Sequence, residues 1–340
     1  MPHRFSLFIV VCLLALLAAA GAGAYPWPVR PFHKQHPIRA NFGDPRTIFS
    51  LAFFDNGIEG PGEFAFHNGI DISAPDGTAV YPVMSGTAHV VSGDELVVDT
   101  GLGRSFQYFH IAPLVLDDTQ VIAQKTLLGY IRKGYGHVHL SELRDTRVWN
   151  PLAKGGMAPY RDRTRPTVSS IDFREYNTLH ELDPLGVCGN VSIVSEAFDT
   201  PPMKVRGTFA LFPVAPALVT WTLRRVGSGG IIAGPTNAAD FRGTLPFNPD
   251  FWNVYARGTY QNAPRFGIRQ FGLMPVRFLY NLTPSGLDTR TLTNGVYQVT
   301  VRAADIKGNA SSLNQRLTVV NQTGTETGCP RPATPPRPKP

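Results

Sequence analysis

The sequence has few cysteines, a modest share of charged residues and, beyond its first two dozen residues, no long apolar run. Its 3 cysteines are far apart, which excludes the Cys-rich clusters that hold structural zinc. Charged residues make up 17% of the chain, whereas Gly and Pro number 33 and 30. This composition favours short strands and many turns over long helices. A membrane-spanning helix needs about 20 apolar residues, so we expect no membrane span beyond residue 24.

The first residues have the layout of a secretory signal peptide. Arg4 supplies a positive charge, Phe8 to Ala18 form an apolar stretch, and Ala22-Gly23-Ala24 provide a cleavage site of small residues. Cys12 lies within the apolar stretch and lacks the small neighbours of a lipoprotein site. We therefore expect cleavage after residue 24 and a protein that is secreted or held in the cell envelope.

The mature chain would keep two cysteines and a positive charge. Cys188 and Cys329 are compatible with one disulfide in an oxidising compartment, although their spacing does not show that they pair. Loss of Arg4 lowers the formal charge of +7 by one, to +6. Such a charge would attract anionic polymers such as cell-wall teichoic acids or lipid head groups; a solubilising surface without a particular partner explains it equally well. We expect no nucleic-acid partner.

Strand-like segments and turns fill the first half of the chain. Short runs rich in β-branched residues alternate with turns that contain Gly, Asp and Ser, and no amphipathic helix of ordinary length is found. Residues 47–66 contain several Gly and aromatic residues and are predicted to form a surface loop. The strands that we expect lie within residues 38–46, 79–83, 87–91, 95–99, 105–111 and 126–131.

The pattern changes near residues 151–166, where Gly, Pro and Arg predict a linker. Alternating strands resume at Thr167, and the predicted hairpin at 295–321 resembles the closing strands of bacterial immunoglobulin-like sandwiches. We therefore predict an all-β protein. Its expected parts are a signal peptide (1–24), a β-sheet domain (25–160), an immunoglobulin-like β-sandwich (161–322) and a Pro-rich disordered tail (323–340).

Four histidines and one aspartate form the candidate site. They are His67, Asp71, His110, His137 and His139. Imidazole nitrogens and carboxylate oxygens are ligands of catalytic zinc, where three protein groups leave the fourth position to water. A single histidine is more often a hydrogen-bonded, half-buried side chain, but five such residues within one β-rich segment favour a metal site.

The spacing of these residues allows them to meet. Two residues apart on a strand, His137 and His139 would face the same side, about 6.6 Å apart. An extended chain would separate His67 from Asp71 by about 13 Å, but Gly69 permits a bend or bulge that lets both reach one ion. A helix would also bring them together, although Gly69 and its β-branched neighbours argue against one. This geometry does not decide which of His137 and His139 binds the metal.

The segment resembles the lysostaphin-like, LytM-type zinc metalloendopeptidases, which cut peptidoglycan peptides. His67 to Asp71 match the H-x-G-x-D motif of that family and are followed by Ala74-Pro75-Asp76-Gly77-Thr78, a typical continuation. Tyr108-Phe109-His110 match its Y-x-H motif, and His137-Val138-His139 its H-x-H motif. The three motifs occur in the family's order, and the resemblance covers roughly residues 26–145.

The resemblance implies a fold, a metal and a role for each residue. The fold would be of the duplicated hybrid motif type. His67, Asp71 and His139 would bind one Zn²⁺, while His110 and His137 would act on water and substrate. Zinc would polarise the scissile carbonyl and lower the pKa of its bound water towards ~7. A neutral imidazole can take the water's proton and return it to the leaving amine, and the second one can hydrogen-bond the oxyanion.

The flanks of the last motif depart from the family pattern. Asn41 to Arg46 resemble the family's first strand, but Lys133-Gly134-Tyr135-Gly136 replace its polar turn and Pro before H-x-H. Leu140-Ser141-Glu142 stand in place of its Phe-Glu. We expect these changes to alter the groove wall beside the metal without removing a ligand. No H-E-x-x-H helix is present, because His180-Glu181 lack the second His, so the helix-borne zinc proteases are unsupported.

Three hypotheses follow from the sequence. The leading one is a secreted zinc metalloendopeptidase, a hydrolase of class EC 3.4.24.-, that acts on peptidoglycan cross-links or related peptides. A catalytically inactive member of the same fold would bind cell wall or regulate another hydrolase, but such proteins generally lose metal residues, and all are present here. An adhesion or scaffold protein would depend on the second domain, which has no ionisable cluster with an obvious mechanism.

Overall fold

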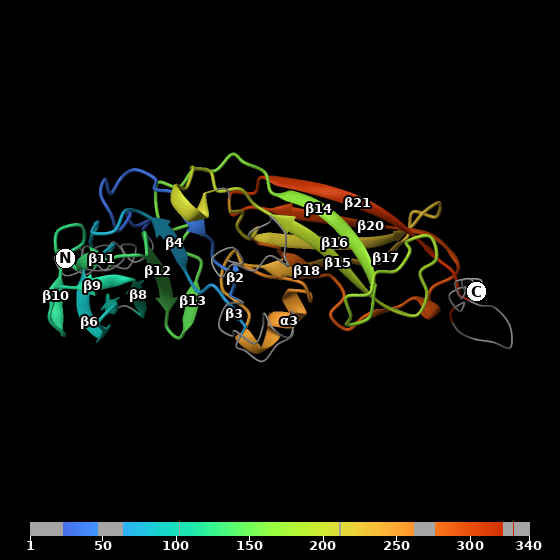
Figure 1. The fold of residues 1–340 in the computed structure, drawn as a ribbon, viewed down its shortest axis with the longest axis horizontal. Helices are drawn as coiled ribbons and strands as arrows, with labels where there is room; N and C mark the ends of the chain where they lie inside the picture. The colour runs from blue at the N-terminus through green and yellow to red at the C-terminus, as the bar shows by residue number, and fades with distance from the viewer. Residues whose placement is uncertain are drawn as a thin grey trace, which may run out of the picture.

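The computed structural model describes residues 23–46, 64–101, 103–210, 212–261, 276–321 and 329. Nearly all of the predicted signal peptide and of the predicted Pro-rich tail lies outside these residues. Regular structure in the described residues is almost entirely β, which confirms the all-β prediction. The molecule is elongated, with the first half of the chain at one end and the second half at the other (Figure 1).

The elements are short and follow the predicted alternation of strands and turns. The strands of the first half are β1 (Ile38–Ala40), β2 (Pro45–Arg46), β3 (Ala65–Phe66), β4 (Ile70–Ser73), β5 (Ala79–Val80), β6 (Gly86–Ser92), β7 (Glu95–Asp99), β8 (Arg104–Phe109), β9 (Ile111–Pro113), β10 (Thr119–Val121), β11 (Gly129–Ile131), β12 (His137–Arg144) and β13 (Arg147–Trp149). The strands of the second half are β14 (Thr167–Glu175), β15 (Asn190–Phe198), β16 (Leu218–Arg225), β17 (Ile231–Asp240), β18 (Leu279–Asn281), β19 (Leu287–Asp288), β20 (Gly295–Ala304) and β21 (Ala310–Val319). The helical turns are η2 (Gly207–Phe209), η3 (Asn248–Asp250), α3 (Phe251–Val254) and η6 (Thr289–Thr291).

The first half is built on an antiparallel sheet in the order β1-β4-β12-β8-β7-β6-β10, with β13 paired to β12. A smaller sheet, β5-β11-β9, accompanies it. The central strand β12 is buried over its first six residues, whereas β8 alternates between buried and partly exposed positions. Ala65–Phe66 were expected within a surface loop, and this was wrong, because they pair with Pro45–Arg46 as the ribbon β2-β3.

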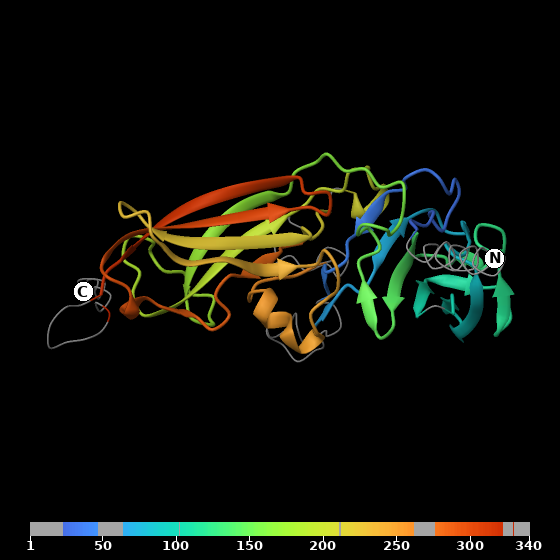
Figure 2. The same ribbon diagram turned by 180° about the vertical axis from the view of Figure 1, so that it is seen from behind.

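The second half consists of two four-stranded antiparallel sheets. One contains β14, β15 and β18 with β19 paired to β15, and the other has the order β17-β16-β20-β21. The two sheets lie one over the other in both ribbon views (Figure 2). Strands β20 and β21 form the long hairpin that the sequence predicted, from Gly295 to Val319.

One continuous hydrophobic core joins the two halves. At their junction the Tyr255 hydroxyl donates to the Gly43 carbonyl at 2.7 Å, and the Ala215 amide donates to Asp44 Oδ1 at 2.7 Å. The segment predicted as a linker is packed into this junction, because Leu152 is only 3% exposed. The second half is therefore held firmly against the first, close to the candidate site.

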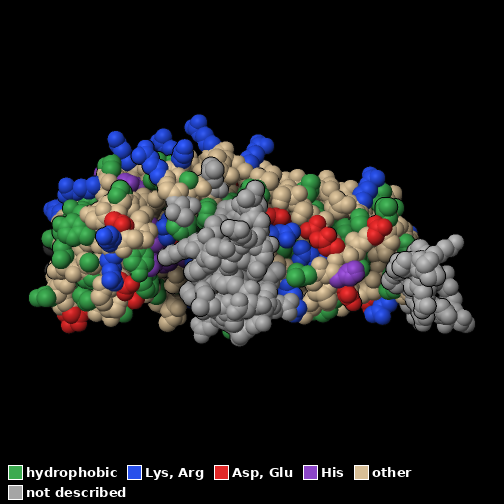
Figure 3. Space-filling view, in the orientation of Figure 1, with side chains coloured by type: hydrophobic (Ala, Val, Ile, Leu, Met, Phe, Trp, Pro, Cys, Tyr) green, Lys and Arg blue, Asp and Glu red, His purple; other side chains and the backbone are tan. Residues whose placement is uncertain are grey.

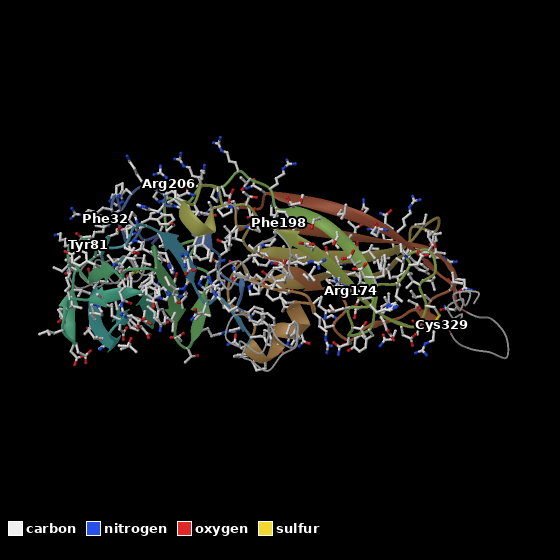
Figure 4. The ribbon with its side chains drawn as sticks, in the orientation of Figure 1. Phe32, Tyr81, Arg174, Phe198, Arg206 and Cys329 are labelled. Atoms are coloured by element: carbon white, nitrogen blue, oxygen red, sulfur yellow. A yellow bond between two sulfur atoms is a disulfide. The ribbon has the colours of Figure 1, made fainter. Side chains whose placement is uncertain are left out.

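Cys188 and Cys329 form a disulfide across a sequence separation of 141 residues. It lies at the far end of the second half, away from the first half (Figure 4). The pairing that the spacing left open is thus formed. No helix in the described part of the chain has the length and apolar character needed to span a bilayer.

Candidate metal and catalytic centre

The main sheet brings the five candidate residues to one place. Strand β12 lies between β4 and β8, and the register sets His139 directly opposite Asp71 on one side and Phe109 on the other. His67 follows β3 and His110 follows β8, so both are carried to the same edge of the sheet. Antiparallel partners in register have neighbouring side chains, which explains why residues 68 positions apart meet.

Three of the side chains converge within hydrogen-bond distance of one another. His67 Nε2 lies 3.1 Å from Asp71 Oδ1 and 2.8 Å from His139 Nδ1, and His139 Nδ1 lies 3.0 Å from Asp71 Oδ1. All three residues are buried, with 4%, 6% and 6% of their surfaces exposed. These are the three residues that the family resemblance assigned to the metal. Their arrangement is compatible with a metal site.

The second nitrogen of each imidazole fixes which nitrogen faces the cluster. His67 Nδ1 donates its proton to the Asn41 carbonyl at 2.8 Å, which leaves Nε2 without one. Ser141 Oγ lies 2.8 Å from His139 Nε2 and can accept the proton of that nitrogen. We assign this tautomer because it gives both buried N–H groups an acceptor. The three converging atoms then present lone pairs and no proton to one another, an arrangement that a cation stabilises.

The donor set fits zinc. Tetrahedral zinc with nitrogen and oxygen ligands holds those atoms about 3.4 Å apart. The observed separations of 2.8–3.1 Å therefore need only a few tenths of an ångström of expansion. Two imidazoles, a carboxylate and hydrogen-bonded outer nitrogens are the usual composition of such a site.

Two arginines stand behind the carboxylate. Asp71 Oδ2 is 3.5 Å from Arg46 Nη2 and 3.8 Å from Arg39 Nε. Burial alone would raise the pKa of Asp71, but the electrostatic influence of His67 and His137, followed by the close contacts of His139 and His67 with its carboxylate, holds that pKa well below its usual range. Burial, aided by Arg46, lowers the pKa of His67 to about 3. The site therefore keeps its carboxylate ionised and this imidazole neutral at physiological pH.

The two histidines assigned to water and substrate flank the cluster. His137 Nδ1 donates to the Tyr135 carbonyl at 2.8 Å, so its Nε2 is unprotonated; that atom lies 3.5 Å from Asp71 Oδ1 and accepts from Arg39 Nη2 at 3.3 Å. The His110 ring lies 4.6 Å from the His137 ring and stacks on Tyr135 at 4.3 Å. Burial lowers the pKa of His137 to about 3 and that of His110 to about 4. Both rings are neutral at pH 7.

His110 has features of a functional position. Its φ of 65° lies in the left-handed region, which is uncommon for a residue with a side chain. Its Nδ1 is buried without a hydrogen-bond partner. Backbone strain and unpaired polar atoms are costly, and they concentrate at sites where a ligand or substrate completes the arrangement.

A cavity of about 630 Å³ opens over these residues and draws its walls from both halves of the chain. Besides the histidines, Asp71 and the two arginines, it is lined by Leu245, Phe247 and Asn248. Phe247 is 74% exposed, and Asn248 Oδ1 accepts from the Phe66 amide at 3.2 Å. Sequence reasoning missed this wall, because nothing in residues 245–248 signals contact with a site some 100 residues earlier.

The departure after the last motif has a different effect from the one expected. Ser141 and Glu142 are fully buried, so they do not alter the groove wall. Ser141 instead contacts His139, while Glu142 accepts from Arg104 at 2.9 Å and from the Tyr25 hydroxyl at 2.7 Å. Tyr135, in the other departure, does line the cavity, as expected.

Neither protein-family models nor curated proteins give a match to this chain. Among solved structures, a zinc-containing peptidase from Vibrio cholerae is 25% identical over 37% of this chain and 39% of its own, with a TM-score of 0.29. LytU is 17% identical over 36% of this chain and 86% of its own, with a TM-score of 0.26. Pseudoalterin, an M23 metalloprotease from the deep sea, is 15% identical over 56% and 96%, with a TM-score of 0.27. The chain spans about two fifths of the Vibrio peptidase. These likenesses are partial, so the function is inferred from the geometry of the site.

Proposed function

We propose that the protein is a zinc metalloendopeptidase of the LytM type that hydrolyses peptide bonds in peptidoglycan or related peptides. The observation that carries the proposal is the convergence of His67 Nε2, Asp71 Oδ1 and His139 Nδ1 within 3.1 Å of one another. Two further neutral imidazoles beside an open cavity support it. These three atoms would hold one Zn²⁺. When bound, the ion would polarise the scissile carbonyl of the substrate and lower the pKa of its bound water.

The remaining residues have chemistry that suits hydrolysis. His137 Nε2 is unprotonated and accepts a long hydrogen bond of 3.3 Å from Arg39; when that bond is exchanged for a water, Nε2 can accept the water's proton and later pass it to the leaving amine. His110 can donate a hydrogen bond to the oxyanion that develops at the scissile carbonyl. Arg39 and Arg46 form ion pairs with Asp71 Oδ2, which orients the carboxylate so that Oδ1 faces the histidines.

The setting of the enzyme is part of the same proposal. The signal-like first 24 residues support export to the cell envelope or beyond it. We also propose that the second half is an immunoglobulin-like sandwich, supported by its two antiparallel sheets and its closing β20-β21 hairpin. The second half also supplies one wall of the cavity, through residues 245–248.

Digestion of purified peptidoglycan by the mature chain tests the proposal. New amino termini are expected with zinc and should vanish with a chelator or in His139→Ala. His89→Ala is the matched control, because His89 is 44% exposed and hydrogen-bonds no residue of the site. If the wild type binds zinc but releases no amino termini from peptidoglycan or peptides, the proposal of a peptidase is wrong. The alternative, a catalytically inactive protein that binds cell wall, then replaces it.

A further inference from the structure

A strip of exposed cations runs along one edge of the molecule. Its members are Lys34, Arg161, Arg163, Arg165, Lys204 and Arg206, all exposed. In the space-filling view, Lys and Arg side chains gather along this edge with few acidic ones among them (Figure 3). Arg206 lies on the same edge in the stick view (Figure 4). We call these six residues the basic strip.

The centre of the basic strip is an extended stretch of chain with alternating burial. Residues 160–166 contain no bend or turn, and Arg161, Arg163 and Arg165 are exposed while Asp162 is 8% exposed and faces inward. Alternate residues of an extended chain point the same way and lie about 7 Å apart. The three arginine side chains therefore leave the chain on the same side at even intervals, as a row.

Inward-facing contacts hold this row in place. Tyr160 donates to Asp162 Oδ2 at 3.2 Å, and the Asn309 amide donates to the Asp162 carbonyl at 3.1 Å. Thr164 donates to the Thr200 carbonyl at 3.0 Å. A row fixed in this way loses little conformational entropy when it binds a ligand.

The outer members of the strip are tied to the same stretch. Gln35 exchanges two hydrogen bonds with the Arg161 backbone, at 2.7 and 3.1 Å, which brings Lys34 beside the row. The bond between Thr164 and Thr200 brings in the loop that carries Lys204 and Arg206. The six cations thus belong to one continuous surface drawn from three parts of the chain.

One of the carboxylates beneath the row does not oppose its charge at pH 7. Asp162, Asp199 and Asp305 form a buried group beneath residues 160–166. Burial, followed by the charge of Asp162, raises the pKa of Asp199 to about 8, so that side chain is neutral at pH 7. None of the six cations has an ion pair with a described residue.

We propose that the basic strip binds a linear polymer whose repeats each carry a phosphate group and no nucleobase. Guanidinium forks bind phosphate oxygens in pairs, and an even row of them matches evenly spaced phosphates. A membrane surface fits less well, because Met203, 37% exposed, is the only exposed large hydrophobic residue in segments 30–36, 160–166 and 200–206. A single-stranded nucleic acid would use exposed aromatic side chains for stacking, and the exposed large hydrophobic residues of these segments include no aromatic one. The binding is independent of the proposed peptidase activity.

The test is the binding of labelled long-chain polyphosphate to the mature chain, followed by fluorescence anisotropy between 50 and 200 mM salt. Six phosphate contacts on a flexible polyanion predict a slope of log affinity against log salt of about −4, which is a loss of about 300-fold over this range. In Arg161→Gln/Arg163→Gln/Arg165→Gln the slope should fall to about −2 and the loss to about 20-fold. These side chains are exposed, so an unchanged unfolding midpoint should accompany the effect.

A matched triple variant separates the strip from net charge. Lys125→Gln/Arg224→Gln/Arg316→Gln removes three exposed cations elsewhere on the molecule and should leave the slope unchanged. Vesicles with 30% phosphatidylglycerol should bind at least tenfold more weakly per accessible phosphate, and single-stranded DNA no more tightly than polyphosphate of equal length. Equal weakening in both triple variants, equal or tighter binding of vesicles, tighter binding of DNA, or no binding at 50 mM salt would each overturn the proposal. No hydrolysis is measured, so its failure leaves the peptidase question untouched.

Discussion

Replacing Gly69 with alanine tests the geometry of the centre at its tightest point. A Cβ atom on Gly69 would lie 2.4 Å from the Leu140 carbonyl oxygen and 2.7 Å from His139 Nε2. Both distances are well below van der Waals contact, and the oxygen belongs to the backbone of β12, which cannot rotate away. The segment from His67 to Asp71 must therefore move away from His139 by roughly an ångström, far beyond the ~0.2 Å tolerance of metal coordination.

The size of the effect follows from two costs. Overpacking of this kind destabilises a protein by about 1–3 kcal/mol. The new methyl group would also press on His139 Nε2, the nitrogen that contacts Ser141, and loss of such an orienting partner lowers metal affinity by about 10–100-fold. We expect Gly69→Ala to lower zinc affinity by at least that factor, as measured by competition with a chelating dye. The free energy of unfolding of the metal-free protein should fall as well, as measured in urea.

Gly93→Ala is the matched control. A Cβ atom at Gly93 meets no atom within 4 Å, so we expect wild-type zinc affinity and a change in unfolding free energy within about 0.5 kcal/mol. The reasoning is refuted if Gly69→Ala binds zinc as the wild type does. It is equally refuted if the two alanine variants lose affinity to the same extent.

Three other predictions concern the surroundings of the centre. Ser141→Ala removes the hydrogen-bond acceptor for His139 Nε2 and should lower zinc affinity about 10–100-fold in a competition titration, while the circular dichroism spectrum stays unchanged. Unchanged zinc affinity would mean that Ser141 does not orient the ring. His67 has a pKa of about 3 and is neutral at both pH 7 and pH 5, so its protonation should not weaken zinc binding over this range, whereas an imidazole of ordinary pKa would lower the affinity roughly 30-fold. A loss of zinc affinity of about 1,000-fold in calorimetric titrations, which protonation of two ordinary imidazoles would cause, contradicts this prediction. Cys188→Ser removes the disulfide that spans 141 residues and should lower the free energy of unfolding, measured in urea, by about 2–5 kcal/mol without changing zinc affinity. An unchanged urea midpoint would show that the disulfide adds no stability.

The sequence predicted the members of the centre because their spacing carries chemical information. Equal parity in H-x-H and a glycine in H-x-G-x-D indicate side chains that can face one ion. The choice between His137 and His139 depends instead on strand register, which pairs His139 with Asp71 and leaves His137 opposite Ser73. Register depends on how whole strands pack, so spacing alone left this choice open, and the assignment of His139 to the metal came from the family resemblance.

The residues that surround the centre could not be predicted from local sequence patterns, because most of them come from distant parts of the chain. Arg46 and the second half meet through Gln261, 215 residues away, and the wall around Phe247 comes from a segment with no motif. The role of Ser141 was misjudged although its spacing held the signal, because a residue two positions after His139 on a strand faces the same side and here contacts that ring. Strand existence followed from alternation and turn residues, while the pairing of β2 with β3 required contacts between distant segments.

The proposed metal centre is tested most directly by measuring which metal the protein binds and through which ligands. Zinc content and zinc K-edge absorption of the purified mature protein should show one ion per chain, bound by two imidazole nitrogens at about 2.0–2.1 Å and by carboxylate or water oxygen. His139→Ala should lose that ion. A wild-type protein that takes up no zinc at micromolar concentration contradicts the account, and so does one whose ion has oxygen ligands alone, as the buried group of Asp162, Asp199 and Asp305 would provide.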